Sequence, residues 1–150
     1  MAEESIITPE MRQAIGMELE PVVMEVEKGH LRRFAQAIDD PNPLWQDEGY
    51  AQGTRYGSII APPTFLCTLR PEGQELPFQN PLRRRLNGGN RWQFFLPVRP
   101  GDVITGRSKI SDIYEAQGRV GRLLFILRET TYTNQRGELV ARHWGTNISY

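Results

Sequence analysis

Few side chains in this 150-residue sequence could act as a base or a nucleophile near neutral pH. Imidazole and thiolate groups do much of that chemistry, and the chain has two histidines, His30 and His143, and one cysteine, Cys67. Each histidine lacks a sequence neighbour that would tune it, so both are interpreted as ordinary surface or hydrogen-bonded histidines. Cys67 is interpreted as a small core residue, because buried thiols in apolar surroundings react poorly.

The carboxylates of most interest belong to residues 40–63, a segment rich in Pro, Gly, Asn and Asp. This composition is typical of a long ordered loop, and we expect one helical turn in it at residues 47–51. Long loops of this kind are usually functional or mobile. Asp47 is the carboxylate to examine, although a solvated charge at a helical turn is the favoured interpretation.

The elements before this loop are expected to be short. Thr8 can cap a helix with Pro9 at its first position, and residues 31–38 place four apolar side chains on one helical face. Residues 22–26 alternate as a strand, and residues 28–30 are expected to end it. The apolar helix face then needs a partner surface.

After the loop, a buried helix is expected to start at Pro63. Residues 70–73 should stop it, and the polar stretch up to Arg85 is interpreted as another loop.

The second half of the chain predicts four strands, at residues 90–96, 103–114, 120–133 and 139–148. Residues 100–102 and 135–137 are expected to join antiparallel neighbours, and residues 115–118 to link two long strands. A buried helix followed by such a meander predicts one α+β domain over residues 1–150. Its antiparallel sheet would wrap around a central helix, which is the hot-dog fold.

The charge balance excludes several kinds of partner. Basic and acidic residues number 18 each, so no global field attracts nucleic acid or an anionic membrane. One cysteine supplies neither an internal disulfide nor a thiolate metal cluster. The acidic N-terminus without a long apolar run predicts no signal peptide and no membrane span. We therefore expect a cytoplasmic protein without a metal or redox cofactor.

Residues 39–51 read DDPNPLWQDEGYA. This segment resembles the hydratase motif of MaoC-like proteins, Asp-x-Asn-Pro-x-His followed by an acidic, Tyr-containing helical turn. Residues 56–65 look like the entry to the hot-dog helix, and residues 94–102 are similar to the strand and turn after it. The resemblance runs from about residue 22 to the C-terminus and implies an acyl-thioester dehydratase or hydratase.

In active members of that family, an aspartate and a histidine hold one water and move protons at the α and β carbons of the thioester. Asp40 takes the aspartate position, but Trp45 stands where histidine is expected. An indole nitrogen only donates, so it cannot accept a proton from water. Losing one positioned acid or base typically costs about 10²- to 10⁴-fold in rate.

A second departure concerns the thioester oxygen, to which a helix-starting glycine offers its N–H in active members. Pro63 occupies that place and has no N–H, so Thr64 or Phe65 would have to donate. The simpler interpretation of Pro63 is a residue that starts a helix.

The resemblance also implies contacts to an acyl thioester carried by coenzyme A or an acyl carrier protein. Trp45, Phe65 and Leu66 would bound the acyl tunnel. The run Arg83, Arg84 and Arg85 could meet the phosphates of coenzyme A or an acidic carrier, although a solvated loop is equally simple. The aromatic residues of the following strand are interpreted first as core or subunit-interface residues and second as acyl contacts; they are Trp92, Phe94 and Phe95.

Three functions stay open at this point. The first is a non-catalytic MaoC-like subunit that shapes the acyl pocket for a catalytic partner interconverting enoyl and 3-hydroxyacyl thioesters. The second is an independent enzyme, either a weak hydratase using Asp40 or a thioesterase using Asp47. The third is a module that only binds an acyl thioester. Because a single hot-dog leaves a sheet edge uncovered, we expect a homodimer or a heterodimer with a catalytic MaoC-like subunit.

Overall fold

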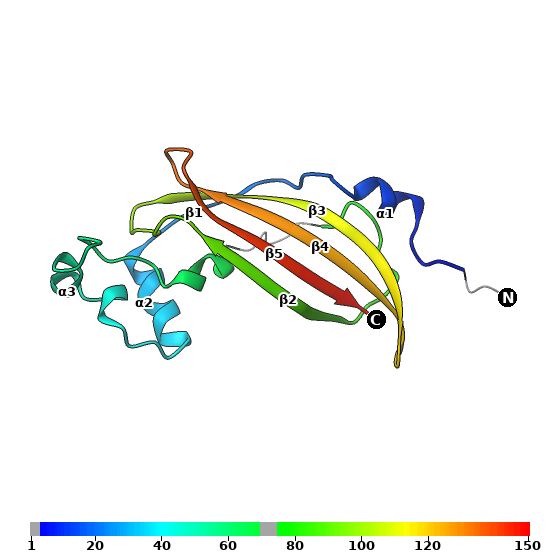
Figure 1. Cartoon of the computed structure of the whole chain (residues 1–150), viewed down its shortest axis with the longest axis horizontal. Helices are drawn as coiled ribbons and strands as arrows, with labels where there is room; N and C mark the ends of the chain where they lie inside the picture. Colours follow the sequence, from blue (N-terminus) through cyan, green and yellow to red (C-terminus); the bar gives the residue numbers. More distant parts are fainter. Residues whose placement is uncertain (1–3, 70–74) are drawn as a thin grey trace.

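The computed structural model describes residues 4–69 and 75–150. Its main feature is a long, curved antiparallel sheet with the strand order β1-β3-β4-β5-β2. Figure 1 shows most of the short helical segments gathered at one end of this sheet and α1 near the other end. An antiparallel sheet combined with a few short helices confirms the expected α+β class.

Three long strands form the body of the sheet: β3 (Val103–Gly118), β4 (Gly121–Thr133) and β5 (Leu139–Ser149). The expected link at residues 115–118 is wrong, because these residues continue β3 until Gly118 pairs with Gly121. Only two residues remain for the turn, and the φ of +115° at Gly121 is one that glycine adopts readily. The turn at residues 135–137 joins the neighbours β4 and β5 as predicted.

Strand β2 (Arg85–Phe94) starts five residues earlier than expected and pairs only with β5, at the edge of the sheet. The prediction that residues 100–102 join antiparallel neighbours is therefore wrong. Strands β4 and β5 lie between β2 and β3, so the chain crosses from one side of the sheet to the other there. A turn-forming sequence marks a reversal, but it carries no information about which strands pair.

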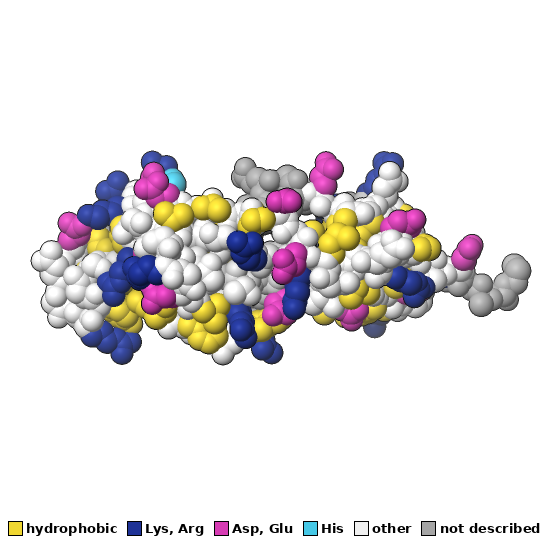
Figure 2. Space-filling model, turned by 90° about the horizontal axis from the view of Figure 1, so that it is seen from above, with side chains coloured by type: hydrophobic (Ala, Val, Ile, Leu, Met, Phe, Trp, Pro, Cys, Tyr) yellow, Lys and Arg dark blue, Asp and Glu magenta, His cyan; other side chains and the backbone are white. Residues whose placement is uncertain are grey.

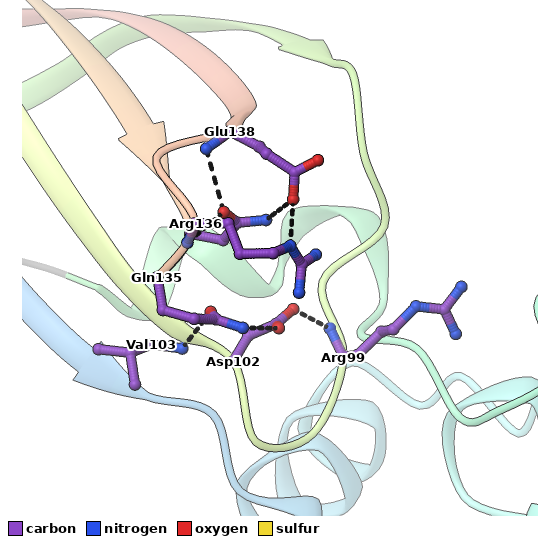
Figure 3. Close-up of polar contacts among 7 residues, drawn as sticks. Arg99, Asp102, Val103, Gln135, Arg136 and Glu138 are labelled. Carbon is purple, nitrogen blue, oxygen red and sulfur yellow. Dashed lines mark hydrogen bonds and ion pairs between the residues drawn. The ribbon is translucent and has the colours of Figure 1, made fainter.

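A buried carboxylate, Asp102, fixes this crossover (Figure 3). It accepts hydrogen bonds from the backbone N–H of Arg99 at 2.8 Å and from the side-chain amide of Gln135 at 3.0 Å. Gln135 in turn accepts from the backbone N–H of Val103 at 3.0 Å. The Arg99 guanidinium donates to the carbonyl of Tyr56 at 2.7 Å. The crossover is thus tied to the β4–β5 turn and to the long loop.

The elements before the long loop agree largely with expectation. Thr8 caps α1 (Pro9–Ala14) by accepting from the N–H of Met11, and β1 (Val22–Glu25) pairs with β3. Residues 28–30 do more than end the strand, because they form the first turn of α2 (Lys28–Ala37). The apolar face of α2 buries Leu31 and Ala35.

The expected buried helix is present only as a short 3₁₀ segment, η2 (Pro63–Thr68), and the predicted stop at residues 70–73 lies outside the described residues. Phe65 and Leu66 are buried, whereas Cys67 is exposed. The interpretation of Cys67 as a core residue is therefore wrong. Three residues per turn send neighbouring side chains in different directions, so this short element buries only part of its surface.

The core is divided along the length of the sheet. One buried cluster, around Leu31, Phe65 and Ile104, packs under α2 and η2. A second cluster, around Met11 and Ile110, packs under α1. In the face seen in Figure 2, basic and acidic side chains are interspersed, so this face carries no extended region of one charge.

Candidate functional site

The loop that resembles the hydratase motif is held by its own polar side chains. Asn42 caps η1 (Pro43–Trp45) by accepting from the N–H of Leu44 at 3.0 Å. One oxygen of Asp40, Oδ1, accepts from the N–H of Asn42 at 3.1 Å. The other, Oδ2, accepts from the indole Nε1 of Trp45 at 2.8 Å. Both carboxylate oxygens of Asp40 are thus engaged within the loop.

Trp45 is a core residue as well as a hydrogen-bond donor. Its side chain is 8% exposed and packs in a small cluster with Ala35 and Ile60. The indole therefore anchors the loop against α2 while its N–H holds the Asp40 carboxylate. This pair cannot deprotonate water through Trp45, because the indole nitrogen has no basic lone pair.

Asp47 occupies a structural position. It is exposed, and its Oδ1 accepts from the N–H of Tyr50 at 3.0 Å, which makes it the N-cap of α3 (Glu48–Gln52). This geometry agrees with the favoured interpretation of a solvated charge at a helical turn.

An apolar cavity of about 320 Å³ lies between η2 and the segment that follows β2. Pro63 and Leu66 line it, together with Phe94, Phe95 and Val140. Of the residues predicted to contact the substrate, the sheet and η2 bring together Pro63, Leu66, Phe94 and Phe95; Val140 was not predicted. Trp45, Thr64 and Phe65 do not line this cavity, since Trp45 and Phe65 are packed in the core and Thr64 faces solvent.

A second cavity, of about 450 Å³, lies on the inner face of the sheet, where apolar side chains such as Leu69 and Ile126 line it together with charged, amide and hydroxyl groups. We call it the polar cavity for those groups. Sequence reasoning missed it. Its lining residues occupy alternate positions along the strands. The sequence signal that could have revealed it is therefore polar side chains at every second strand position, on one face of the sheet. The main polar lining residues are Arg85, Asn90, Arg128, Thr130, Tyr132 and His143.

Of the predicted arginine run, only Arg85 lines this polar cavity. Arg83, Arg84 and Arg85 are all exposed, and the Arg84 guanidinium lies 6.0 Å from the ring centre of Tyr150. The run is therefore split, because Arg85 begins strand β2 while the two residues before it remain in the loop.

His143 forms one wall of the polar cavity. Its ring is half-buried, stacks on Trp92 with 4.2 Å between ring centres, and donates through Nε2 to Asn90 Oδ1 at 2.7 Å. A Cβ at Gly145 would lie 2.9 Å from the ring, so glycine makes room for it. Burial lowers the pKa of His143. The expectation of a hydrogen-bonded histidine is met, with a partner that lies 53 residues away in the sequence.

The stability of the chain is expected to fall as the pH drops below about 6.5, the ordinary pKa of histidine. Because burial lowers the pKa of His143 in the folded state, the unfolded chain binds a proton while the folded ring stays neutral. This contribution is present above the unfolded pKa and is lost as the pH falls toward the folded pKa. Urea midpoints across this range should show a smaller decrease for His143→Gln than for wild type. An equal decrease in both would contradict the assignment.

Comparison with models of protein families shows the family to which this chain belongs. A model of the dehydratase domain region of FAS1-like proteins matches residues 13–143. The chain belongs to this dehydratase family. Two relatives of this family member, each called a UPF0336 protein, come from Thermobifida fusca and Parafrankia. The first is 38% identical over 65% of this chain and 68% of the relative, and the second 34% over 80% of both.

Solved structures of dehydratases share the fold of this dehydratase-family chain. The truncated HadBC dehydratase complex of Mycobacterium tuberculosis has a TM-score of 0.76 and 25% identity, over 91% of this chain and 97% of that one. The MaoC-like dehydratase of Rhodospirillum rubrum has a TM-score of 0.70 and 22% identity, over 91% and 92%. These matches confirm the expected hot-dog fold. No helix among the described residues is long and apolar enough to cross a membrane.

Proposed function

We propose that this chain is a non-catalytic subunit of a MaoC-like dehydratase, which shapes the acyl pocket while a partner supplies the catalytic Asp and His. The observation that carries the proposal is the bond between Trp45 and Asp40. Where an active member needs a base, this chain has a buried hydrogen-bond donor. The carboxylate beside it is engaged by that donor and by the N–H of Asn42.

The start of η2 supports the same proposal. Pro63 has no N–H, and the N–H of Phe65 is used in a bond to the carbonyl of Pro62 at 2.9 Å. Thr64 and Phe65 were the two candidates to donate an N–H to the thioester oxygen, so the backbone N–H of Thr64 is the candidate that remains. A site with one such donor in place of a preorganised set stabilises a thioester oxyanion poorly.

The apolar cavity beside η2 is suited to an acyl chain. Its 320 Å³ falls at the lower end of the usual range for ligand sites, and its walls include Leu66, Phe94 and Phe95. The two phenylalanines are each 44% exposed, which leaves their apolar surface available to a ligand or a partner. In the proposed assembly, this cavity holds the end of the acyl chain remote from the reacting carbons.

The edge strand β2 supports a partner. Long, exposed edge strands invite pairing with another chain, and β2 carries the exposed Leu86 and Phe94 along its ten residues. Among similar proteins, HadBC and ChsH1-ChsH2 of Mycobacterium tuberculosis are complexes. A probable enoyl-CoA hydratase alpha subunit of Thermomonospora curvata is 26% identical to this chain. The match covers 74% of this chain and 40% of that protein.

The purified chain alone is expected to hydrate crotonyl-CoA or a longer enoyl-CoA at least about 10²- to 10⁴-fold more slowly than its complex with a catalytic MaoC-like subunit. Loss of the absorbance of the conjugated thioester measures the rate. Co-expression with a MaoC-like subunit that carries both Asp and His supplies the partner. The matched control is the same complex with the partner's catalytic histidine replaced by glutamine, which should return the rate to that of the chain alone.

Enzyme-like turnover by the chain alone would contradict the proposal. Two substitutions then identify the catalytic carboxylate. Loss of hydration activity in Asp40→Asn would indicate a hydratase. Loss of thioester cleavage in Asp47→Asn would indicate a thioesterase. Acyl-CoA binding without turnover in any combination with a catalytic subunit would instead indicate a binding module.

A further inference from the structure

The polar cavity on the inner face of the sheet is distinct from the apolar cavity beside η2. It lies over β4, β5 and β2, and of the residues that line the apolar cavity none also lines this one. Nothing in the proposed role of the chain uses it. Its lining includes apolar side chains such as Leu69 and Ile126, but it also carries two guanidinium groups and several amide and hydroxyl side chains.

Arg128 is the central residue of this floor. It lies in the middle of β4, where it pairs with Gly145 of β5, and Gly145 pairs in turn with Asn90 of β2. The Arg128 guanidinium and the Asn90 amide line the same cavity, and the His143 ring occupies the space over Gly145 between them. Arg128 is half-buried and close enough to Arg85 for the two positive charges to repel each other.

Neither arginine has an anionic partner within residues 4–69 and 75–150: no carboxylate there forms an ion pair with Arg85 or Arg128. Glu75 lines the adjoining part of the cavity with both arginines but forms no such pair. Burial, and secondarily the charge of Arg85, lowers the pKa of Arg128. Arginine nevertheless stays charged in proteins, so deprotonation cannot relieve the repulsion.

A bound anion would relieve the repulsion between Arg85 and Arg128. A guanidinium presents donors in a fixed planar fork that matches the oxygens of a carboxylate or phosphate group, and such charge-assisted bonds are about twice as strong as neutral ones. Asn90 and His143 lie beside the arginines, and the hydroxyl groups of Ser108 and Thr130 close the floor, 2.8 Å from one another. The Asn90 amide and the hydroxyl pair supply further donors to an oxygen-rich ligand, whereas the single N–H of the neutral His143 ring is already donated to Asn90.

We propose that this cavity binds an anionic group with several acceptor oxygens, a carboxylate or a phosphate ester, with Arg128 and Arg85 as its principal ligands. The site is independent of the dehydratase role proposed above. It can be tested on the purified chain without any catalytic partner, so its failure and the failure of the proposed function are separate results.

The test is isothermal titration calorimetry of the full chain at low ionic strength with two probes, inorganic phosphate and glutarate. Arg128→Gln is expected to weaken binding of the preferred probe by about 10- to 100-fold, the equivalent of one or two charge-assisted hydrogen bonds. Arg142→Gln is the matched control, because it removes the same charge from an exposed position of β5 whose side chain points to the opposite face from His143. Its affinity should stay within about twofold of wild type.

Saturable binding of phosphate that Arg128→Gln weakens by about 10-fold or more would assign a phosphate group, and the same result with glutarate would assign a carboxylate. No saturable binding of either probe by wild type overturns the proposal. An equal loss in Arg128→Gln and Arg142→Gln also overturns it, since the effect is then one of net charge. If the circular dichroism spectrum of Arg128→Gln shows that this variant is unfolded, Arg85→Gln and Arg128→Lys replace it in the same test. Each of them removes one guanidinium and leaves the other side chains of the cavity unchanged.

Discussion

Replacing Trp45 by alanine is expected to lower the free energy of unfolding by about 3 to 5 kcal/mol, the range for removing a large buried aromatic side chain. The substitution would leave a cavity next to Ala35 and Ile60. It would also remove the indole N–H that Asp40 Oδ2 accepts at 2.8 Å. Urea denaturation followed by circular dichroism measures the change, provided that the slope of the transition stays the same.

Trp45→Phe is the matched variant, because it keeps most of the aromatic volume and removes only the donor. It is expected to lower stability by about 1 to 3 kcal/mol, the usual effect of leaving a partly buried acceptor without its partner. A loss below about 1 kcal/mol for Trp45→Ala would show that the indole is not a structural anchor of the loop. The non-catalytic interpretation of the Asp40–Trp45 pair would then lose its main support.

Replacing Phe65 by alanine is expected to lower the free energy of unfolding by a similar amount, about 3 to 5 kcal/mol. Phe65 is 2% exposed and meets Phe34 edge to face, with 5.6 Å between the ring centres. Aromatic pairs in this arrangement contribute about 0.5 to 1.5 kcal/mol beyond the area that they bury. Because this contact joins η2 to α2, its loss should loosen the helical layer from the sheet. Chemical denaturation of the purified variant measures the change.

Thr64→Ala provides the control on the same turn, since Thr64 is exposed and should change stability by no more than about 0.5 kcal/mol. Similar midpoints for Phe65→Ala and wild type would mean that η2 contributes little to the core. Equal losses for Phe65→Ala and Thr64→Ala would mean that the backbone of the turn, and not the aromatic contact, carries the stability.

The local features of this chain could be predicted from its residues. Alternating apolar side chains identified the strands that became β3, β4 and β5, and Thr8 with Pro9 marked the start of α1. The Asp-x-Asn-Pro pattern and the tryptophan after it located the loop around Asp40. These signals act over a few residues, so they are present in the order of the residues themselves.

The errors arose where distant segments had to meet. Residues 100–102 form a turn, but β4 and β5 lie between the strands that it connects, and only the pairing of β2 with β5 decides that. Cys67 sits in an apolar stretch, yet the 3₁₀ geometry of η2 leaves it exposed. Residues 115–118 contain a glycine and polar side chains, but pairing with β4 extends the strand through them.

By itself, the sequence determined the strand periodicity, the helix caps and the presence of an indole donor at position 45. Only the tertiary structure decided that this donor binds Asp40, and that Arg85, Arg128 and His143 share one cavity. The physical reason is the register of the sheet. Residues far apart in the chain come to face the same side only when particular strands pair, and a shift of one residue would turn each side chain to the opposite face.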